Sequence, residues 1–320
     1  MILALETSCD ETAAAVVSAE GEIRSNVVAS QADLHARYGG VVPEVASRRH
    51  LELVAPVVRE ALEVADTPLD DIRTVAVTQG PGLIGALLVG LQAAKAIALA
   101  RELPLVPVDH LQGHVASLYL APQHFEPPFL CLLASGGHTM LLNVRSHAEQ
   151  DLLGSTLDDA AGEAFDKGAR LLGLGYPGGA AIDRVAREGD ENAFDFPVAR
   201  VPGFDFSFSG LKTALLYTVR DLGGDVEARR ADLAASYQRA IVRALVDRTL
   251  AAAQATSAKR IAVVGGVAAN SALRGALPDA ALAPLPLCTD NAAMIASAAR
   301  FGEPVPYPRY LGLDAYASAG

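Results

Sequence analysis

Short apolar segments bounded by polar or glycine-rich turns alternate with longer segments of helical spacing in the first part of the chain. Short apolar runs between turn residues favour strands, and apolar positions spaced by three and four favour helices. The pattern predicts, in order, strands at 2–8, 12–18 and 22–30, a helix from Glu44 to Ala65, a strand from Thr74 to Gln79, a helix from the turn at 80–82 to Arg101, a strand from Leu105 to Val108 and a helix that begins at Asp109 or His110. The predicted order is therefore βββαβαβα.

The second part of the chain repeats this order. It predicts strands at 129–134, 138–144 and 151–155, a long helical region to Ala255, a strand at 261–264, a helix at Asn270, a strand from Leu285 to Cys288 and a helix from Asp290 to Phe301. A repeated unit of this size indicates internal duplication. The duplicated α/β order resembles the actin, Hsp70 and sugar-kinase (ASKHA) superfamily, which implies two lobes with a nucleotide and metal cleft between them.

The length of the chain is consistent with two lobes, because 320 residues suffice for two cores of ordinary size. We expect an N-terminal lobe at residues 1–125 and a C-terminal lobe at 126–320, with a helical insertion at about 157–255. Hydrophobic residues make up 51% of the chain and charged residues 20%. This balance predicts a folded chain, since ample apolar surface is available to offset the entropy of ordering the backbone.

Cysteine content and the N-terminal sequence predict a cytoplasmic location. The three cysteines are odd in number, widely spaced and without a C-x-x-C pair, which argues against a disulfide framework: Cys9, Cys131 and Cys288. No basic leader precedes the first apolar run. The longest apolar stretch, Leu83 to Ala100, contains Lys95 and follows a glycine-proline turn, so we expect a buried helix there and no membrane span. The net charge of −11 means that a nucleic-acid substrate needs a local basic patch or a partner protein.

His110 and His114 lie four residues apart at the start of a predicted helix. This spacing places both imidazoles on one face of the helix, where they can share a metal ion. Asp290 is a candidate third ligand, because it follows the predicted strand at 285–288 as His110 follows the strand at 105–108. Pseudo-symmetry then predicts that Asp290 faces the histidines across the cleft. Two histidines and a carboxylate suit iron(II), zinc or manganese, and the alternative is a coincidental surface pair.

Two glycine turns are candidates for phosphate binding. Ser135, Gly136 and Gly137 lie between two apolar strands, and Gly265-Gly266 follows the strand at 261–264. The absence of side chains lets backbone N–H groups approach a phosphate closely, although the first turn alone is also an ordinary hairpin. Asn270 can contact a base or ribose with its amide, or it can simply cap the next helix.

Four carboxylates are further candidates. Asp166 can accept hydrogen bonds from ribose hydroxyls, and Asp183 lies near a helix start where phosphate or hydroxyl groups can approach. Asp10 and Glu11 occupy the first hairpin turn, where they can position a metal ion or water. The alternatives are solvated helical carboxylates and an ordinary acidic turn, respectively.

These motifs together resemble the TsaD/Gcp family, the tRNA N6-adenosine threonylcarbamoyltransferases, once described as sialoglycoprotein endopeptidases. The resemblance runs in order from about Ile2 to Arg309 and rests on the segments 6–12, 38–44, 110–114, 135–139, 162–167, 205–213 and 289–291. Small departures occur at Val264, Ala269 and Ala292, and the last adds a Cβ where the family commonly has glycine.

The resemblance implies transfer of the threonylcarbamoyl group from threonylcarbamoyl-AMP to the exocyclic amine of the adenosine beside the tRNA anticodon, with release of AMP. It implies the metal ligands His110, His114 and Asp290, with iron(II) favoured and zinc, manganese or magnesium as alternatives. It implies substrate contacts from Leu133, Ala134, Ser135, Gly136, Gly137, Asp166, Gly179, Asp183 and Asn270. It also implies two partners, a TsaB-like paralogue and a TsaE-like ATPase, and a homodimer is an alternative assembly.

Other functions are weaker on residue grounds. A metal-dependent endopeptidase of the zincin type needs a glutamate directly after the first histidine, and this chain has Leu111 there. A nonenzymatic, nucleotide-gated module of the Hsp70 type needs a further domain, and little sequence follows Phe301. A sugar kinase does not account for the two histidines and Asp290.

Overall fold

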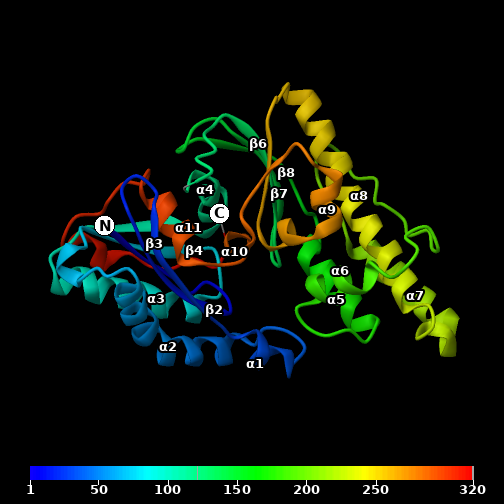
Figure 1. The fold of residues 1–320 in the computed structure, drawn as a ribbon, viewed down its shortest axis with the longest axis horizontal. Coiled ribbons are helices and arrows are strands. Elements are labelled where there is room, and N and C mark those ends of the chain that lie inside the picture. Colours follow the sequence, from blue (N-terminus) through cyan, green and yellow to red (C-terminus); the bar gives the residue numbers. More distant parts are fainter. Residues whose placement is uncertain (121, 319–320) are drawn as a thin grey trace. The chain divides into compact units, whose positions relative to one another are not determined.

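The computed structural model describes residues 1–120 and 122–318, which form two compact units (Figure 1). The first unit is Met1–Glu126 together with the segment that begins at Thr289, and the second unit is Pro127–Cys288. The C-terminal lobe expected at 126–320 therefore ends at Cys288. The reason is that α11 (Ala292–Ala299) packs against β1, β2 and α4 of the first unit, so the chain returns to the unit in which it began.

The sheet of the first unit has five strands in the order β3-β2-β1-β4-β5. These strands are β1 (Ile2–Glu6), β2 (Glu11–Val17), β3 (Ile23–Ser30), β4 (Thr74–Gly80) and β5 (Leu105–Asp109). The pairs β1–β2 and β2–β3 are antiparallel, and β1–β4 and β4–β5 are parallel. Because parallel strands end at the same edge of a sheet, Glu6, Gly80 and Asp109 lie along one edge.

Helices cover this sheet, whose central strands β1 and β4 are buried almost throughout. The helical segments are α1 (Ala32–Ala36), α2 (Pro43–Val64), η1 (Leu69–Asp71), α3 (Ile84–Ala100), α4 (His110–Ala116), η2 (Ser117–Tyr119), α11 and η5 (Arg309–Gly312). Helices α2 and α3 pack on each other and on the sheet, while α4 packs on α11 (Figure 1). The apolar stretch Leu83–Ala100 thus forms a helix against the sheet, as predicted. Within the described part of the chain, no helix is both long and apolar enough to cross a membrane.

The second unit repeats the strand order of the first. Its sheet runs β10-β9-β6-β7-β8, with β6 (Phe129–Ala134), β7 (Thr139–Val144), β8 (Gln150–Ser155), β9 (Ile261–Val264) and β10 (Ala281–Leu282). As in the first unit, two antiparallel pairs are joined to two parallel pairs. The predicted α/β fold with internal duplication is confirmed, since both sheets share one topology.

The long helical region predicted in the second unit is divided into several helices. They are α5 (Ala161–Leu171), α6 (Gly178–Ala186), α7 (Ser209–Leu222), η3 (Gly223–Val226) and α8 (Arg230–Thr256), followed after β9 by η4 (Gly266–Ala269), α9 (Ser271–Ala276) and α10 (Leu285–Cys288). Helix α8 packs on α6 and β6. All three cysteines of the chain are free thiols.

The strand predicted from Leu285 to Cys288 is wrong, because this segment is the short helix α10. Two prolines, Pro284 and Pro286, lack the N–H group that a strand ladder requires, and proline is well suited to the first turn of a helix. The N–H of Leu287 donates to the carbonyl of Pro284 at 2.8 Å and closes this turn. The last strand of the sheet is instead the two-residue β10.

Candidate metal centre and nucleotide site

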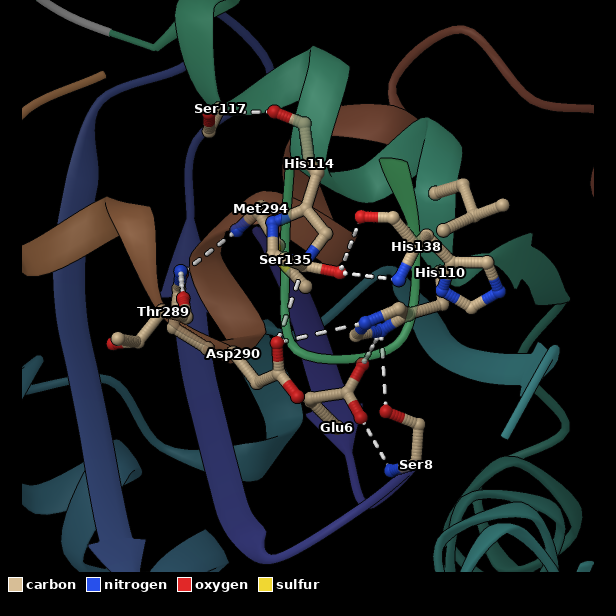
Figure 2. A network of polar contacts seen from close by, with 12 residues as sticks. Glu6, Ser8, His110, His114, Ser117, Ser135, His138, Thr289, Asp290 and Met294 are labelled. Carbon is tan, nitrogen blue, oxygen red and sulfur yellow. Dashed lines mark hydrogen bonds and ion pairs between the residues drawn. The ribbon is translucent and has the colours of Figure 1, made fainter. Parts of the chain in front are cut away.

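His110, His114 and Asp290 converge in the first unit. One ligand atom from each residue lies within 4.8 Å of the others. Oδ1 of Asp290 is 3.5 Å from Nε2 of His110 and 3.3 Å from Nε2 of His114 (Figure 2). Two imidazoles and a carboxylate at this separation form a donor set suited to one divalent ion.

Two capped helices bring these side chains together. The side chain of Asp109 accepts hydrogen bonds from the N–H groups of Leu111 and Gln112, so α4 begins at His110. Asn291 accepts from the N–H of Met294 at 3.0 Å and caps α11 directly after Asp290. The two helices approach closely at Gly113, where an added Cβ would lie 2.8 Å from Cδ1 of Ile295.

Asp290 reaches the histidines by a route other than the predicted one. We expected it to face them across a cleft from the second lobe, after a strand at 285–288. Asp290 lies instead in the first unit, because the chain re-enters that unit at Thr289. The predicted proximity is therefore present, but the return of α11 to the first unit produces it, and the argument from pseudo-symmetry is wrong.

The imidazole of His114 is the best structural indication of a metal ion. The residue is fully buried, and neither ring nitrogen has a hydrogen-bond partner among the described residues. Nε2 is close to Asp290 but lacks the alignment of a hydrogen bond. An unsatisfied buried polar group costs about 1–3 kcal/mol. A metal ion bound to Nε2 removes part of this cost, so the residues fit such an ion.

Charge at this centre also favours a cation. Burial alone would raise the pKa of the Asp290 carboxyl, but His110 and then His114 hold that pKa far below its usual range. Burial alone would lower the pKa of His110, but Asp290 and Glu6 raise it well above the usual value. The buried carboxylates thus favour the protonated form of His110 in the metal-free protein. A metal ion replaces that positive charge when it binds.

Asp10 and Glu11 lie in the turn after β1 and at the start of β2. The hydroxyl of Ser30 donates to Oε1 of Glu11 at 2.8 Å. Burial, together with the nearby carboxylates of Asp10 and Asp290, raises the pKa of Glu11 to about 9. Glu11 therefore holds a proton at neutral pH.

Substitution Glu11→Gln tests this protonation through stability. Between the ordinary carboxyl pKa of 4.5 and the folded value of about 9, the folded state binds a proton that the unfolded state lacks. Stability of the wild type therefore falls as pH rises through this window, and the glutamine variant lacks that contribution. We expect the variant to gain Tm relative to the wild type as pH rises from about 5 to about 8 in metal-free protein. Parallel Tm profiles would contradict the assignment, and Glu60→Gln, an exposed glutamate on α2, is the control.

The two glycine turns lie at one edge of the second sheet. Strands β6 and β9 are parallel neighbours, with Leu133 opposite Val264, so the turns that follow them are adjacent. A Cβ added at Gly136, Gly137 or Gly266 would meet no atom within 4 Å, which leaves the backbone open on that side. Such an edge, at the carboxyl ends of parallel strands, is where α/β folds commonly bind ligands.

Hydrogen bonds connect the predicted substrate residues to the starts of three helices. The carbonyl of Ser135 accepts from the N–H of Gly162 at 3.1 Å, near the start of α5. Asp166 accepts from the N–H of Gly178 at 2.7 Å, at the start of α6. Asp183 accepts from the N–H and hydroxyl of Ser271, at the start of α9. Asp166 thus ties α5 to the start of α6, and Asp183 ties α6 to the start of α9.

The remaining predicted contacts differ in what they offer. Asn270 caps α9 by accepting from the N–H of Leu273 at 3.0 Å, and its amide donates to Gln238 at 2.7 Å. The capping alternative for Asn270 is therefore what the structure shows. Leu133 and Ala134 are buried in β6, and a Cβ at Gly179 would meet only Phe165, at 3.9 Å.

Sequence reasoning missed the buried residues around His110. Glu6 and Thr78 are buried side chains, and Oε2 of Glu6 lies 3.0 Å from Nδ1 of His110 (Figure 2). A charged residue at the end of an otherwise apolar strand was the available signal, since a buried carboxylate needs specific partners. Its partner, more than a hundred positions away in sequence, had no local signal.

The shared topology of the two units identifies the fold class. Component A of the (R)-2-hydroxyglutaryl-CoA dehydratase of Acidaminococcus fermentans superposes with a TM-score of 0.57 at 14% identity, covering 94% of this chain and 96% of that one. HypF of T. kodakarensis gives a TM-score of 0.61 at 16% identity, covering 93% of this chain and 46% of that one. The chain thus has the duplicated α/β fold of the actin, Hsp70 and sugar-kinase proteins.

Sequence comparison gives the family. The model of the TsaD family, tRNA N6-adenosine threonylcarbamoyltransferase, matches residues 22–297. A protein of that name from Symbiobacterium thermophilum is 55% identical over 307 residues, covering 93% of this chain and 90% of the relative. Another from Clostridium novyi is 51% identical over 312 residues, covering 94% and 92%. The chain belongs to the tRNA N6-adenosine threonylcarbamoyltransferase family, which confirms the resemblance seen in its motifs.

Proposed function

We propose that this chain transfers the threonylcarbamoyl group from threonylcarbamoyl-AMP to the exocyclic amine of the adenosine adjacent to the anticodon in tRNAs, and releases AMP. The observation that carries this proposal is an intact cluster of His110, His114 and Asp290 in a chain of this family. In the reaction the amine nitrogen forms a bond to the carbamoyl carbon. The bond from that carbon to the phosphate oxygen breaks, and the amine loses a proton.

His110, His114 and Asp290 are the residues that would hold one divalent metal ion, and iron(II) is favoured over zinc, manganese or magnesium. When bound, such an ion supplies a Lewis acid that polarises a carbonyl group. The support is the close approach of three donors and the unsatisfied imidazole of His114.

The second unit is the proposed nucleotide site. Backbone N–H groups of Ser135, Gly136 and Gly137 are placed to hold the phosphate, because the outer side of this turn is open. Backbone groups of Leu133, Ala134 and Gly179 line the same site in this proposal, and Asp166, Asp183 and Asn270 contact the rest of the nucleotide. The last three also hold helix starts, so their substitution affects both folding and binding.

Asp10 and Glu11 are the residues we propose for the proton that the amine loses. Glu11 carries a proton at neutral pH, so it is not the first acceptor, and the neighbouring Asp10 takes that role. Fixed hydrogen-bonding groups on the phosphate stabilise the charge of the departing AMP. Alignment of the weakly nucleophilic amine supplies the remaining acceleration.

Partner proteins are part of this proposal, and a TsaB-like paralogue and a TsaE-like ATPase are the expected ones, with a homodimer as the alternative. The charge of −11 opposes unaided binding of tRNA. Two arginines of α2 are already paired: Arg48 with Glu44 at 2.8 Å and Arg49 with Glu52 at 2.5 Å. These exposed pairs are weak, but the two glutamates partly neutralise the positive charge on this part of α2. A cytoplasmic location, where tRNA and these partners meet, stays a prediction.

Mass spectrometry of tRNA nucleosides tests the proposed reaction. Unmodified tRNA is incubated with the chain, threonylcarbamoyl-AMP and the candidate partners, and threonylcarbamoyladenosine is measured after digestion. We expect the modified nucleoside to appear only when the chain is present. A parallel incubation with unfolded protein substrates should give no cleavage, because Leu111 replaces the glutamate of zincins. Chelator-sensitive cleavage without tRNA modification would favour the endopeptidase alternative instead.

A further inference from the structure

Glu6 is a fully buried carboxylate whose contacts all lie beside the candidate metal centre. It is the last residue of β1 and has no exposed surface. Oε1 accepts a hydrogen bond from the backbone N–H of Ser8, and Oε2 accepts from the hydroxyl of Thr78 at 2.5 Å. Oε2 also lies 3.0 Å from Nδ1 of His110 (Figure 2). Neither lysine nor arginine is among these partners, so the positive charge that balances Glu6 comes from the His110 side.

These contacts determine which nitrogen of His110 carries hydrogen. Nδ1 of His110 lies 3.0 Å from Oε2 of Glu6 and 3.2 Å from Oγ of Ser8. An ionised carboxylate only accepts hydrogen bonds, whereas the Ser8 hydroxyl can donate or accept, so the contact with Glu6 requires Nδ1 to donate. In the neutral imidazole that binds metal, the lone pair is then on Nε2. Nε2 is the nitrogen that faces Asp290, at 3.5 Å. The geometry therefore presents the free nitrogen of His110 to the candidate metal position.

We propose that Glu6 is the positioning residue of the metal centre, and that it fixes both the ring orientation and the tautomer of His110. This inference rests on the proposed metal function of His110, His114 and Asp290. His114 differs, because neither of its ring nitrogens has such a partner among the described residues. A carboxylate behind a ligating histidine commonly raises metal affinity about 10–100-fold.

Substitution Glu6→Gln tests the role with little change in shape. The glutamine amide keeps one acceptor oxygen, but an NH₂ group replaces the other oxygen. This NH₂ group then faces a hydrogen-bond donor that the carboxylate of Glu6 accepts from in the wild type. We expect the affinity for Zn²⁺ and Co²⁺, measured by competition with a chromophoric chelator, to fall about 10–100-fold. Glu60→Gln, which removes an exposed carboxylate of the same unit, should leave the affinity unchanged.

A second variant separates positioning from damage to the core. Thr78→Val removes one hydrogen bond to Oε2 but keeps the carboxylate and nearly the same volume. We expect its metal affinity to stay within about 3-fold of wild type, a much smaller change than the fall of about 10–100-fold expected for Glu6→Gln. Circular dichroism of each variant reports whether the fold is retained.

The tautomer itself gives a readout that a purely structural role would not change. In the zinc-loaded wild type, ¹⁵N-histidine NMR should show His110 with hydrogen on Nδ1, and in Glu6→Gln this state should be partly lost. Equal metal affinity in folded wild type and Glu6→Gln would overturn the proposal, as would an equal loss in Thr78→Val. If the wild type itself binds no metal, the metal centre fails, and the positioning role fails with it. If only the Glu6 result is negative, the metal centre stands.

Discussion

Replacement of His114 by alanine is expected to leave a folded chain that holds no metal ion and transfers the threonylcarbamoyl group at least about 100-fold more slowly. His114 is fully buried, and its ring makes no hydrogen bond with described residues. Its loss breaks no hydrogen bond with described residues, but it removes packing and the contact of Nε2 with the Asp290 carboxylate. We expect a cost of about 1–3 kcal/mol from these two losses. It removes one of three closely placed donors, however, and the two that remain make a weak site.

Metal content and transfer rate measured on the same preparation check this expectation. His147→Ala is the matched control, because His147 is an exposed histidine of the second unit. The control should keep its metal ion and its rate. A His114→Ala protein that retains one metal ion per chain would show that the ion is held elsewhere.

Substitution Gly265→Ala is expected to destabilise the second unit by about 2–5 kcal/mol and to abolish AMP binding. Gly265 has a φ of +90°, a conformation that residues with a Cβ rarely adopt. The added Cβ would also lie 2.4 Å from the carbonyl oxygen of Ala134, at the end of β6. Relief of this contact displaces the end of β6, which leads directly into the Ser135-Gly136-Gly137 turn proposed to hold the phosphate.

Gly266→Ala is the matched control for this effect. The neighbouring glycine has ordinary backbone geometry, and an added Cβ would meet no atom within 4 Å. Thermal unfolding should therefore show that the stability of this variant is close to that of the wild type. Equal loss of stability in both variants would contradict the argument from the conformation of Gly265.

The order of strands and helices followed from sequence wherever local pattern decides structure. Alternation of apolar runs and glycine turns predicted both five-stranded sheets except at Leu285–Cys288, where apolar character suggested a strand and two prolines produced a helix. The lobe boundary was wrong for a different reason. The return of α11 to the first unit is a long-range packing event, and nothing in the local spacing of residues 289–301 specifies it.

At the candidate site, too, local spacing was predictable from sequence and long-range contacts were not. The four-residue spacing of His110 and His114 predicted a shared helix face, and the structure brings them to Asp290. The contact of Glu6 with His110 joins the ends of two strands that are distant in sequence, so only the sheet topology reveals it. Asn270 was ambiguous because an amide that caps a helix and one that contacts a nucleotide have the same local sequence.

Metal titration of single-turnover transfer tests the central claim most directly. Metal-free chain is loaded with increasing iron(II) under reducing, anaerobic conditions, with labelled threonylcarbamoyl-AMP, unmodified tRNA and the partner proteins present. The predicted result is that transfer rises with added iron and reaches its maximum at one ion per chain in the wild type, and that Asp290→Asn stays inactive at the same loading. Transfer at the full rate by the metal-free chain, or by folded Asp290→Asn, would contradict the assignment of His110, His114 and Asp290 to the reaction.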